Sequence, residues 1–198
     1  LILGGGVTGC YLAAMLAERG KAVTLIERAG HLGGRAATVR NARTSEPLEI
    51  GPHLIMGAYR ATRRFAATVA AEDLLLFQDR LSIPFRYDAE SITRFTCPSL
   101  PAPLHVAAGL LRFPALSLPD RLSGVWMGRE LRHIRKYGTD HLDQITVLTW
   151  LNRCGQTDNI IRKLWEPLCV AALNYPTEKG SAKLFANVLV EAFCQSKE

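Results

Sequence analysis

The sequence lacks several features that would each have placed it in a particular class of protein. It has no run of about 18 apolar residues, which a membrane-spanning helix needs, and no signal peptide. Its five cysteines are widely spaced and form no C-x-x-C pair, and its histidines show no metal-ligand spacing. It has no internal repeat and no low-complexity tract. We therefore expect a protein of a reducing cytosol, with no disulfide framework and no bound metal.

What is present is the composition of a globular protein. Apolar residues make up 48% and charged residues 21% of the 198 positions, which argues against intrinsic disorder. At this length we expect one full domain and part of another. With 24 basic and 18 acidic residues the net charge is +6, which attracts anionic phosphates or an anionic membrane surface. The basic residues form no zinc-finger or RNA-binding signature, so nucleic acid is not expected as a partner.

The first 27 residues have the pattern of a βαβ unit. A short apolar run at residues 1–3 ends in three glycines, and apolar residues then recur at helical spacing between residues 9 and 20. Residues 22–27 (AVTLIE) form an apolar run typical of a buried parallel strand. This order predicts an α/β chain that begins with a Rossmann-like nucleotide-binding fold.

A glycine fingerprint lies between the first strand and the helix. Gly4 permits the tight turn, Gly6 lets the backbone approach a diphosphate, and Gly9 lets the helix pack closely on the strand. The helix N-terminus offers N–H groups and a partial positive charge to the diphosphate. Glu27 ends the next strand, where it is placed to accept hydrogen bonds from the ribose and to repel a 2′-phosphate, which disfavours NADP. The fingerprint leaves NAD and FAD open, and glycines that merely form a tight turn are the alternative.

Beyond residue 57 the pattern becomes mixed and then mostly helical. We expect the domain boundary there, with a nucleotide-binding domain in residues 1–57 and a second region in 58–198. A helix is expected at 58–71, short strands of a small sheet at about 74–97, and no continuous helix across the proline-rich residues 98–119. Further helices are expected at 121–137, 146–154, 159–173 and 181–193.

A second glycine motif, Leu32-Gly33-Gly34-Arg35, follows the acidic strand end. It resembles the corresponding motif of the flavin-containing amine oxidase and phytoene desaturase superfamily, in which it supports the diphosphate and ribose of FAD. Glycines permit a close approach, and an arginine can bind a phosphate through two charge-assisted hydrogen bonds. The resemblance implies that FAD is the cofactor and that these residues bind it: Gly4, Gly5, Gly6, Gly9, Glu27, Arg28, Gly34, Arg35 and Gly51.

Four later segments narrow the resemblance, which extends over nearly the whole chain. They are residues 49–53 (EIGPH), 53–60 (HLIMGAYR), 100–105 (LPAPLH) and 164–174 (LWEPLCVAALN). They closely resemble the bacterial hydroxysqualene dehydroxylases of hopanoid biosynthesis. The resemblance implies an oxidoreductase that removes the hydroxyl of hydroxysqualene, with hydride from reduced FAD, to give squalene and water. It places His53 near the isoalloxazine as the candidate catalytic residue, and a histidine that only bonds a neighbouring loop is the alternative.

The sequence departs from this family in two respects. Glu49 stands where family members usually have aspartate, which keeps the charge and lengthens the side chain. Family members also continue beyond the equivalent of Glu198, so we expect this chain to be an amino-terminal portion that is inactive by itself. The rivals are a carotenoid desaturase or an amine oxidase of the same superfamily and, from another class, a non-catalytic nucleotide-binding module.

Three further segments have two interpretations each. Leu164, Trp165 and Leu168 recur at helical spacing and form either core or a wall for substrate. Residues 104–118 are either a packed connection or an interfacial segment, and the basic run at residues 129–136 is either a solvated helix face or a contact for lipid headgroups. We expect a long-chain isoprenoid as substrate and a cytoplasmic protein, with peripheral contact at the inner face of the cell membrane as the sharper alternative.

Overall fold

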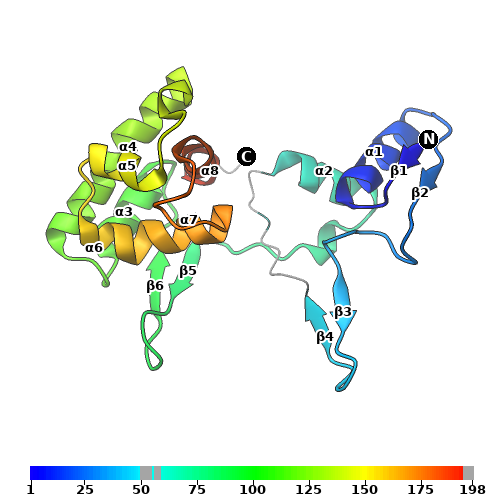
Figure 1. The fold of residues 1–198 in the computed structure, drawn as a ribbon, viewed down its shortest axis with the longest axis horizontal. Coiled ribbons are helices and arrows are strands. Elements are labelled where there is room, and N and C mark those ends of the chain that lie inside the picture. The colour runs from blue at the N-terminus through cyan, green and yellow to red at the C-terminus, as the bar shows by residue number, and fades with distance from the viewer. Residues whose placement is uncertain (50–54, 56–58, 194–198) are drawn as a thin grey trace. The chain divides into compact units, whose positions relative to one another are not determined.

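The chain folds into two compact units, residues 1–77 and 78–198 (Figure 1). The computed structural model describes residues 1–49, 55 and 59–193, with Glu49 described by its backbone. Among its described residues the first unit holds short strands, two α-helices and a 3-10 turn, whereas the second unit is mainly helical and contains the large hydrophobic core. The expected α/β fold with a largely helical second region is confirmed.

The first unit begins with the predicted βαβ arrangement. Strand β1 (Ile2–Leu3) pairs in parallel with β2 (Leu25–Ile26), and helix α1 (Val7–Glu18) connects the two. The paired strands are shorter than the apolar runs in the sequence, because hydrogen-bonded pairing involves two residues of each. Parallel pairing brings the carboxyl end of β2 next to the turn that follows β1, and this juxtaposition positions the candidate site.

A β-hairpin follows, which the sequence pattern did not predict. Strand β3 (Thr38–Arg40) pairs antiparallel with β4 (Pro47–Glu49). Asn41 begins the turn, and its side-chain oxygen accepts a hydrogen bond from the Arg43 N–H at 2.9 Å. Ser45 adopts a positive φ of 59°, a conformation in which few non-glycine residues lie.

Helix α2 (Arg60–Thr68) belongs to the first unit because it packs on α1. The rings of Tyr11 and Phe65 meet edge to face with centroids 5.9 Å apart, and the Thr68 hydroxyl donates to the Glu18 carboxylate at 2.9 Å. The short 3-10 turn η1 (Glu72–Leu74) then lies where a strand was expected to begin. The compact units therefore divide after residue 77, whereas the sequence pattern changes at residue 57. The assignment of residues 1–57 to cofactor binding and of residues 58–198 to substrate binding stays a prediction.

The second unit opens with the small sheet that the sequence predicted and continues with helices. Strands β5 (Ser82–Phe85) and β6 (Thr93–Thr96) form an antiparallel pair. The elements that follow are α3 (Leu104–Arg112), α4 (Leu118–Tyr137), η2 (Asp140–Leu142), α5 (Val147–Arg153), α6 (Asp158–Ile160), the π-helical turn η3 (Ile161–Trp165), α7 (Glu166–Leu173) and α8 (Ala182–Phe193). The proline-rich stretch is thus interrupted between α3 and α4, as expected.

One buried carboxylate links two helix starts in this unit. Asp120, which is 4% exposed, accepts hydrogen bonds from the Ser117 N–H and hydroxyl at 2.9 and 2.6 Å, which forms a capping box at the start of α4. It also accepts from Asn159 at 2.6 Å and from the hydroxyl of Thr157, the cap of α6. Burial raises the pKa of Asp120, but these hydrogen bonds outweigh burial and hold the pKa well below its ordinary value.

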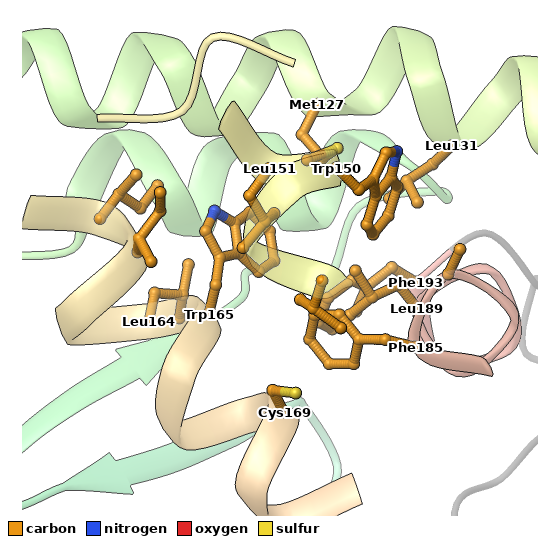
Figure 2. Packing of buried hydrophobic residues seen from close by; sticks show 14 of the residues in the cluster. Met127, Leu131, Trp150, Leu151, Leu164, Trp165, Cys169, Phe185, Leu189 and Phe193 are labelled. Atoms are coloured by element: carbon orange, nitrogen blue, oxygen red, sulfur yellow. The ribbon is translucent and has the colours of Figure 1, made fainter. Parts of the chain in front are cut away.

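The core of the second unit contains the first part of the segment at residues 164–174. Figure 2 shows Trp165 and Leu164 among the buried side chains, and each is 2% exposed. The Trp165 indole N–H donates to Gln156 at 2.8 Å, so its one polar group is satisfied inside the core. Leu168 packs against the same cluster, and Cys169 is fully buried. The sequence left two interpretations open for these residues, core or substrate wall. The structure places Leu164 and Trp165 in the core.

Candidate functional site

The glycine turn between β1 and α1 is shaped by backbone contacts that exclude a side chain at one position. Gly4 has a φ of +99°, and its N–H donates to the Ile26 carbonyl at 2.8 Å. A Cβ added at Gly9 would lie 1.9 Å from the Gly4 carbonyl oxygen. Only glycine lets the first turn of α1 approach the strand end this closely, which is the role predicted for the third glycine of the fingerprint.

Gly6 differs from Gly9 because no protein atom requires its small size. It is the N-cap of α1, and a Cβ added there would meet nothing within 4 Å. The first turn of α1 carries no acidic residue, so no side chain of the helix itself neutralises its N–H groups and partial positive charge. Open space beside a glycine at a helix N-terminus can receive the phosphate of a ligand.

The second glycine motif lies directly beside the first. The Gly33 N–H donates to the Gly5 carbonyl at 2.8 Å, and Gly33 forms a parallel β-bridge with Gly6. A Cβ added at Gly34 would lie 3.1 Å from the Cα of Gly6, and Gly34 adopts a positive φ of 62°. Two motifs that are separated in sequence by most of α1 and by β2 thus line one small surface.

Glu27 connects this surface to the end of β2. One carboxylate oxygen accepts from the Gly5 N–H at 2.6 Å and the other from the Ala29 N–H at 2.8 Å. Backbone hydrogen bonds from Ala29 and Gly5, with a smaller contribution from the Arg28 charge, lower the pKa of Glu27 below its ordinary value. The carboxylate is therefore ionised at neutral pH, and each oxygen retains lone pairs that can accept a hydroxyl donor such as those of a ribose.

The structure brings together most of the predicted cofactor residues. Gly4, Gly5, Gly6, Gly9, Glu27 and Gly34 form one continuous constellation through the contacts above. Arg28 and Arg35 lie on the same loop and are exposed. Gly51 and His53 fall outside the described residues, so their proposed roles stay predictions. Among the residues that the structure does describe, no three His, Cys, Asp or Glu side chains gather as a metal site.

Two residues that contact the glycine turn, Gly33 and Cys10, were not among the predicted cofactor-binding residues. Gly33 makes the bridge to Gly6, and the Cys10 thiol donates to the Gly5 carbonyl at 3.2 Å. Gly33 has a φ of +103°, and a Cβ there would lie 2.7 Å from the Ala36 carbonyl oxygen. The double glycine in the sequence was the signal for Gly33, because two adjacent glycines commonly mark backbone with positive φ.

The fold and the site define a class of protein, and comparison with known families gives the same class. Residues 2–69 match the family model described as the NAD(P)-binding Rossmann-like domain. The match contains both glycine motifs and the acidic strand end. The amino-terminal unit therefore has a Rossmann-like fold.

The chain as a whole is related to hydroxysqualene dehydroxylases, as its sequence motifs indicated. It is 27% identical to the hydroxysqualene dehydroxylase of Sinorhizobium fredii, over 100% of this chain and 44% of that protein. It is 26% identical to the 15-cis-phytoene desaturase of Synechococcus elongatus, over 100% of this chain and 42% of that protein. An FAD-dependent oxidoreductase of Monascus ruber is 40% identical over 34% of this chain and 14% of its own length. The chain thus spans less than half the length of these relatives.

A solved structure supports the fold over the same extent. The Rab GDI of Plasmodium falciparum superposes with a TM-score of 0.52, covering 96% of this chain and 48% of that one at 18% identity. At this identity the likeness concerns the fold alone.

In the described part of the chain no helix is both long and apolar enough to cross a membrane.

Proposed function

We propose that this chain forms the FAD-binding amino-terminal part of an oxidoreductase of isoprenoid metabolism. The observation that carries the proposal is the meeting of Gly6 and Gly34, where the two glycine motifs leave an open backbone surface at the N-terminus of α1. The names of the relatives provide independent support for FAD and for an isoprenoid substrate.

The residues of this surface fit the parts of FAD. Gly6, Gly34 and the first N–H groups of α1 would hold the diphosphate, because they leave space and present hydrogen-bond donors. Glu27 would accept the hydroxyls of the adenosine ribose, since its carboxylate is already ionised and oriented by the backbone. Arg35, and with it Arg28, would add positive charge near the phosphates. FAD, when bound, supplies the capacity to donate or accept a hydride.

For the reaction itself we propose reductive dehydroxylation of hydroxysqualene to squalene. The likeness to hydroxysqualene dehydroxylases over the whole chain supports this choice. Loss of the hydroxyl as water requires a proton donor, and His53 is the candidate in this chain for that task or for orienting the substrate. A long apolar substrate also favours a cytoplasmic protein with peripheral contact at the inner face of the cell membrane.

The test uses the full-length protein that contains this chain. We expect it to copurify with FAD, recognised by its absorption spectrum, and to convert hydroxysqualene to squalene in the presence of a reductant, followed by mass spectrometry of the extracted lipid. Gly6→Val should abolish FAD binding, because the added methyl groups occupy the space reserved for the diphosphate. Gly128→Val is the matched control, because a Cβ added at Gly128 would also meet nothing within 4 Å. Gly128 lies on α4, outside the glycine motifs, so this variant should keep FAD. FAD retained in the Gly6 variant would contradict the cofactor assignment.

A second candidate reaction is desaturation of a carotenoid precursor, which the likeness to phytoene desaturase favours. The same preparation, supplied with phytoene and an electron acceptor, separates the two reactions by the mass of the product. A flavin spectrum that no isoprenoid substrate changes would instead favour a non-catalytic nucleotide-binding module.

A further inference from the structure

Helix α4 carries an apolar stripe on the face that points away from the core. Leu118, Leu122 and Trp126 recur every four residues and are 63%, 46% and 59% exposed. Met127 and Leu131, on the opposite face of the helix, are buried in the core of the second unit. The core side of α4 is therefore already packed, and the stripe lies outside the buried core cluster.

The second half of α4 is basic. Its cationic side chains are all exposed: Arg129, Arg132, Arg135 and Lys136. The helix rises about 1.5 Å per residue, so these charges lie within about 15 Å, or three turns, of the end of the apolar stripe. The outer surface of α4 thus changes along its length from apolar to cationic.

Neither acidic residue in this part of the chain offsets the positive charge on the outer surface. Residues 98–137, all of which the structure describes, contain two acids, Asp120 and Glu130. Asp120 is buried and bound by the caps of two helices. Glu130 faces inward, where its carboxylate accepts from the Trp150 indole at 3.2 Å and meets His141 at 3.1 Å. The exposed charged groups of this segment are therefore cationic.

One contact joins the apolar and cationic halves. The Arg129 guanidinium lies over the Trp126 ring, 5.0 Å from its centroid. Tryptophan is the residue most typical of the boundary between hydrocarbon and headgroups, and an arginine can extend from an apolar surface towards phosphate. Together these side chains have the chemistry of a bilayer interface.

Helix α3 extends the apolar surface beside the first turn of α4. The Arg121 guanidinium donates to the carbonyls of Leu111 and Leu116 at 2.9 Å each, which holds the end of α3 against α4. Leu111 is 44% exposed, whereas Phe113, in the connecting turn, is buried. Residues 104–118, which the sequence left open as either a packed connection or an interfacial segment, are thus of two kinds. Some, such as Phe113, belong to the core, whereas leucines such as Leu111 and Leu118 are exposed.

We propose that this face, defined by Leu111, Leu118, Leu122, Trp126 and the basic residues Arg129, Arg132 and Lys136, binds the surface of an anionic lipid bilayer. The apolar half would enter the headgroup boundary and the cationic half would contact lipid phosphates. A second copy of the chain is disfavoured as the occupant, because a symmetric contact would oppose two surfaces of the same positive charge. The proposal rests on the proposed function only in that an isoprenoid substrate gives the attachment a purpose.

Vesicle binding of the full-length protein tests the proposal. Sedimentation with vesicles of phosphatidylcholine alone should leave the protein in solution, whereas vesicles that also contain phosphatidylglycerol should bind it at low salt and release it at high salt. Leu122→Gln with Trp126→Gln should weaken binding about tenfold or more, and Arg129→Gln with Arg132→Gln by roughly tenfold to thirtyfold. These variants change exposed side chains, so the thermal unfolding temperature should stay close to that of the wild type.

Two control variants match the chemistry at other positions. Leu74→Gln with Leu76→Gln removes leucines that are 80% and 95% exposed in the first unit, and Arg153→Gln with Arg162→Gln removes exposed charges elsewhere in the second unit. Both controls should bind vesicles as the wild type does. No binding to anionic vesicles, equal binding to neutral ones, or equal losses in the controls would overturn the proposal. So would a wild-type dimer that the Leu122 and Trp126 changes dissociate.

Flavin content and squalene formation are measured on the same preparations with substrate in detergent. A protein that binds vesicles but holds no flavin would contradict the proposed function and leave the bilayer contact standing. A protein that contains flavin and forms squalene but does not bind anionic vesicles would contradict the bilayer contact and leave the proposed function standing.

Discussion

The carboxylate of Glu27 accepts a hydrogen bond of 2.6 Å from the backbone N–H of Gly5. This contact joins the end of β2 to the glycine turn after β1, and it orients the acid beside the surface that Gly6 and Gly34 line. Glu27 therefore has a structural task before any ligand arrives. It holds the turn in place through this hydrogen bond.

Replacing Glu27 should change how stability depends on pH. The pKa of Glu27 is lowered in the folded chain from its ordinary value of 4.5, so its contribution to stability is present above that value and is lost as the pH falls through the lower, folded pKa. We expect the difference in unfolding temperature between the wild type and Glu27→Gln to shrink steadily below about pH 4.5. Thermal scans of the apo protein between neutral and acidic pH measure this difference. A difference that stays constant with pH would show that the carboxylate charge is unimportant for the turn.

Gly6 and Gly9 should respond differently to the same substitution. Gly9→Ala forces a Cβ to within 1.9 Å of a backbone oxygen, and we expect a loss of about 3 kcal/mol or more in the free energy of unfolding of the first unit. Gly6→Ala enters open space and should cost less than about 1 kcal/mol. Limited proteolysis of the apo protein within residues 1–77 reports the difference. Equal protease resistance of the two variants would contradict the distinction.

Removing the buried carboxylate at Asp120 should destabilise the second unit. Asp120→Ala deletes the hydrogen bonds to Ser117, Thr157 and Asn159 and leaves their donors unpaired, so we expect a loss of about 2–4 kcal/mol. Asp158→Ala is the matched control, because Asp158 is an exposed acid at the start of α6 and should change stability by less than about 0.5 kcal/mol. Urea unfolding followed by tryptophan fluorescence measures both variants.

Trp165→Phe should lower stability and leave substrate affinity unchanged. The indole is 2% exposed, and its N–H donates to Gln156, so the variant loses buried area and leaves Gln156 without this donor. We expect a loss of about 1–3 kcal/mol in the free energy of unfolding. The KM for the isoprenoid should not change by more than about twofold, because the side chain does not reach the surface. A large increase in KM with unchanged stability would instead support the interpretation that Trp165 forms part of a wall for the substrate.

Local sequence patterns predicted much of this protein because the relevant interactions are local. The spacing of Gly4, Gly6 and Gly9 requires a strand, a turn and a helix within a few residues, and this is the observed order. Several helix bounds were also predicted: the helix expected at 146–154 is α5 (Val147–Arg153), and the helix expected to end at residue 173 ends there, as α7 (Glu166–Leu173). The hairpin of β3 and β4 was not predicted, since its strands are three residues each and their side chains do not alternate clearly between apolar and polar.

Other features depended on contacts between residues far apart in the chain. The sequence identified both glycine motifs, but it did not show that Gly33 pairs with Gly6 or that Glu27 bonds to Gly5, because parallel pairing of β1 with β2 creates those neighbours. Helical spacing alone could not say whether Leu164 and Trp165 face the core. Within residues 98–137 the sequence determined which side chains are apolar or basic, whereas the tertiary structure decided which of them are exposed, because packing on the core covers one face of each helix and leaves the other to solvent.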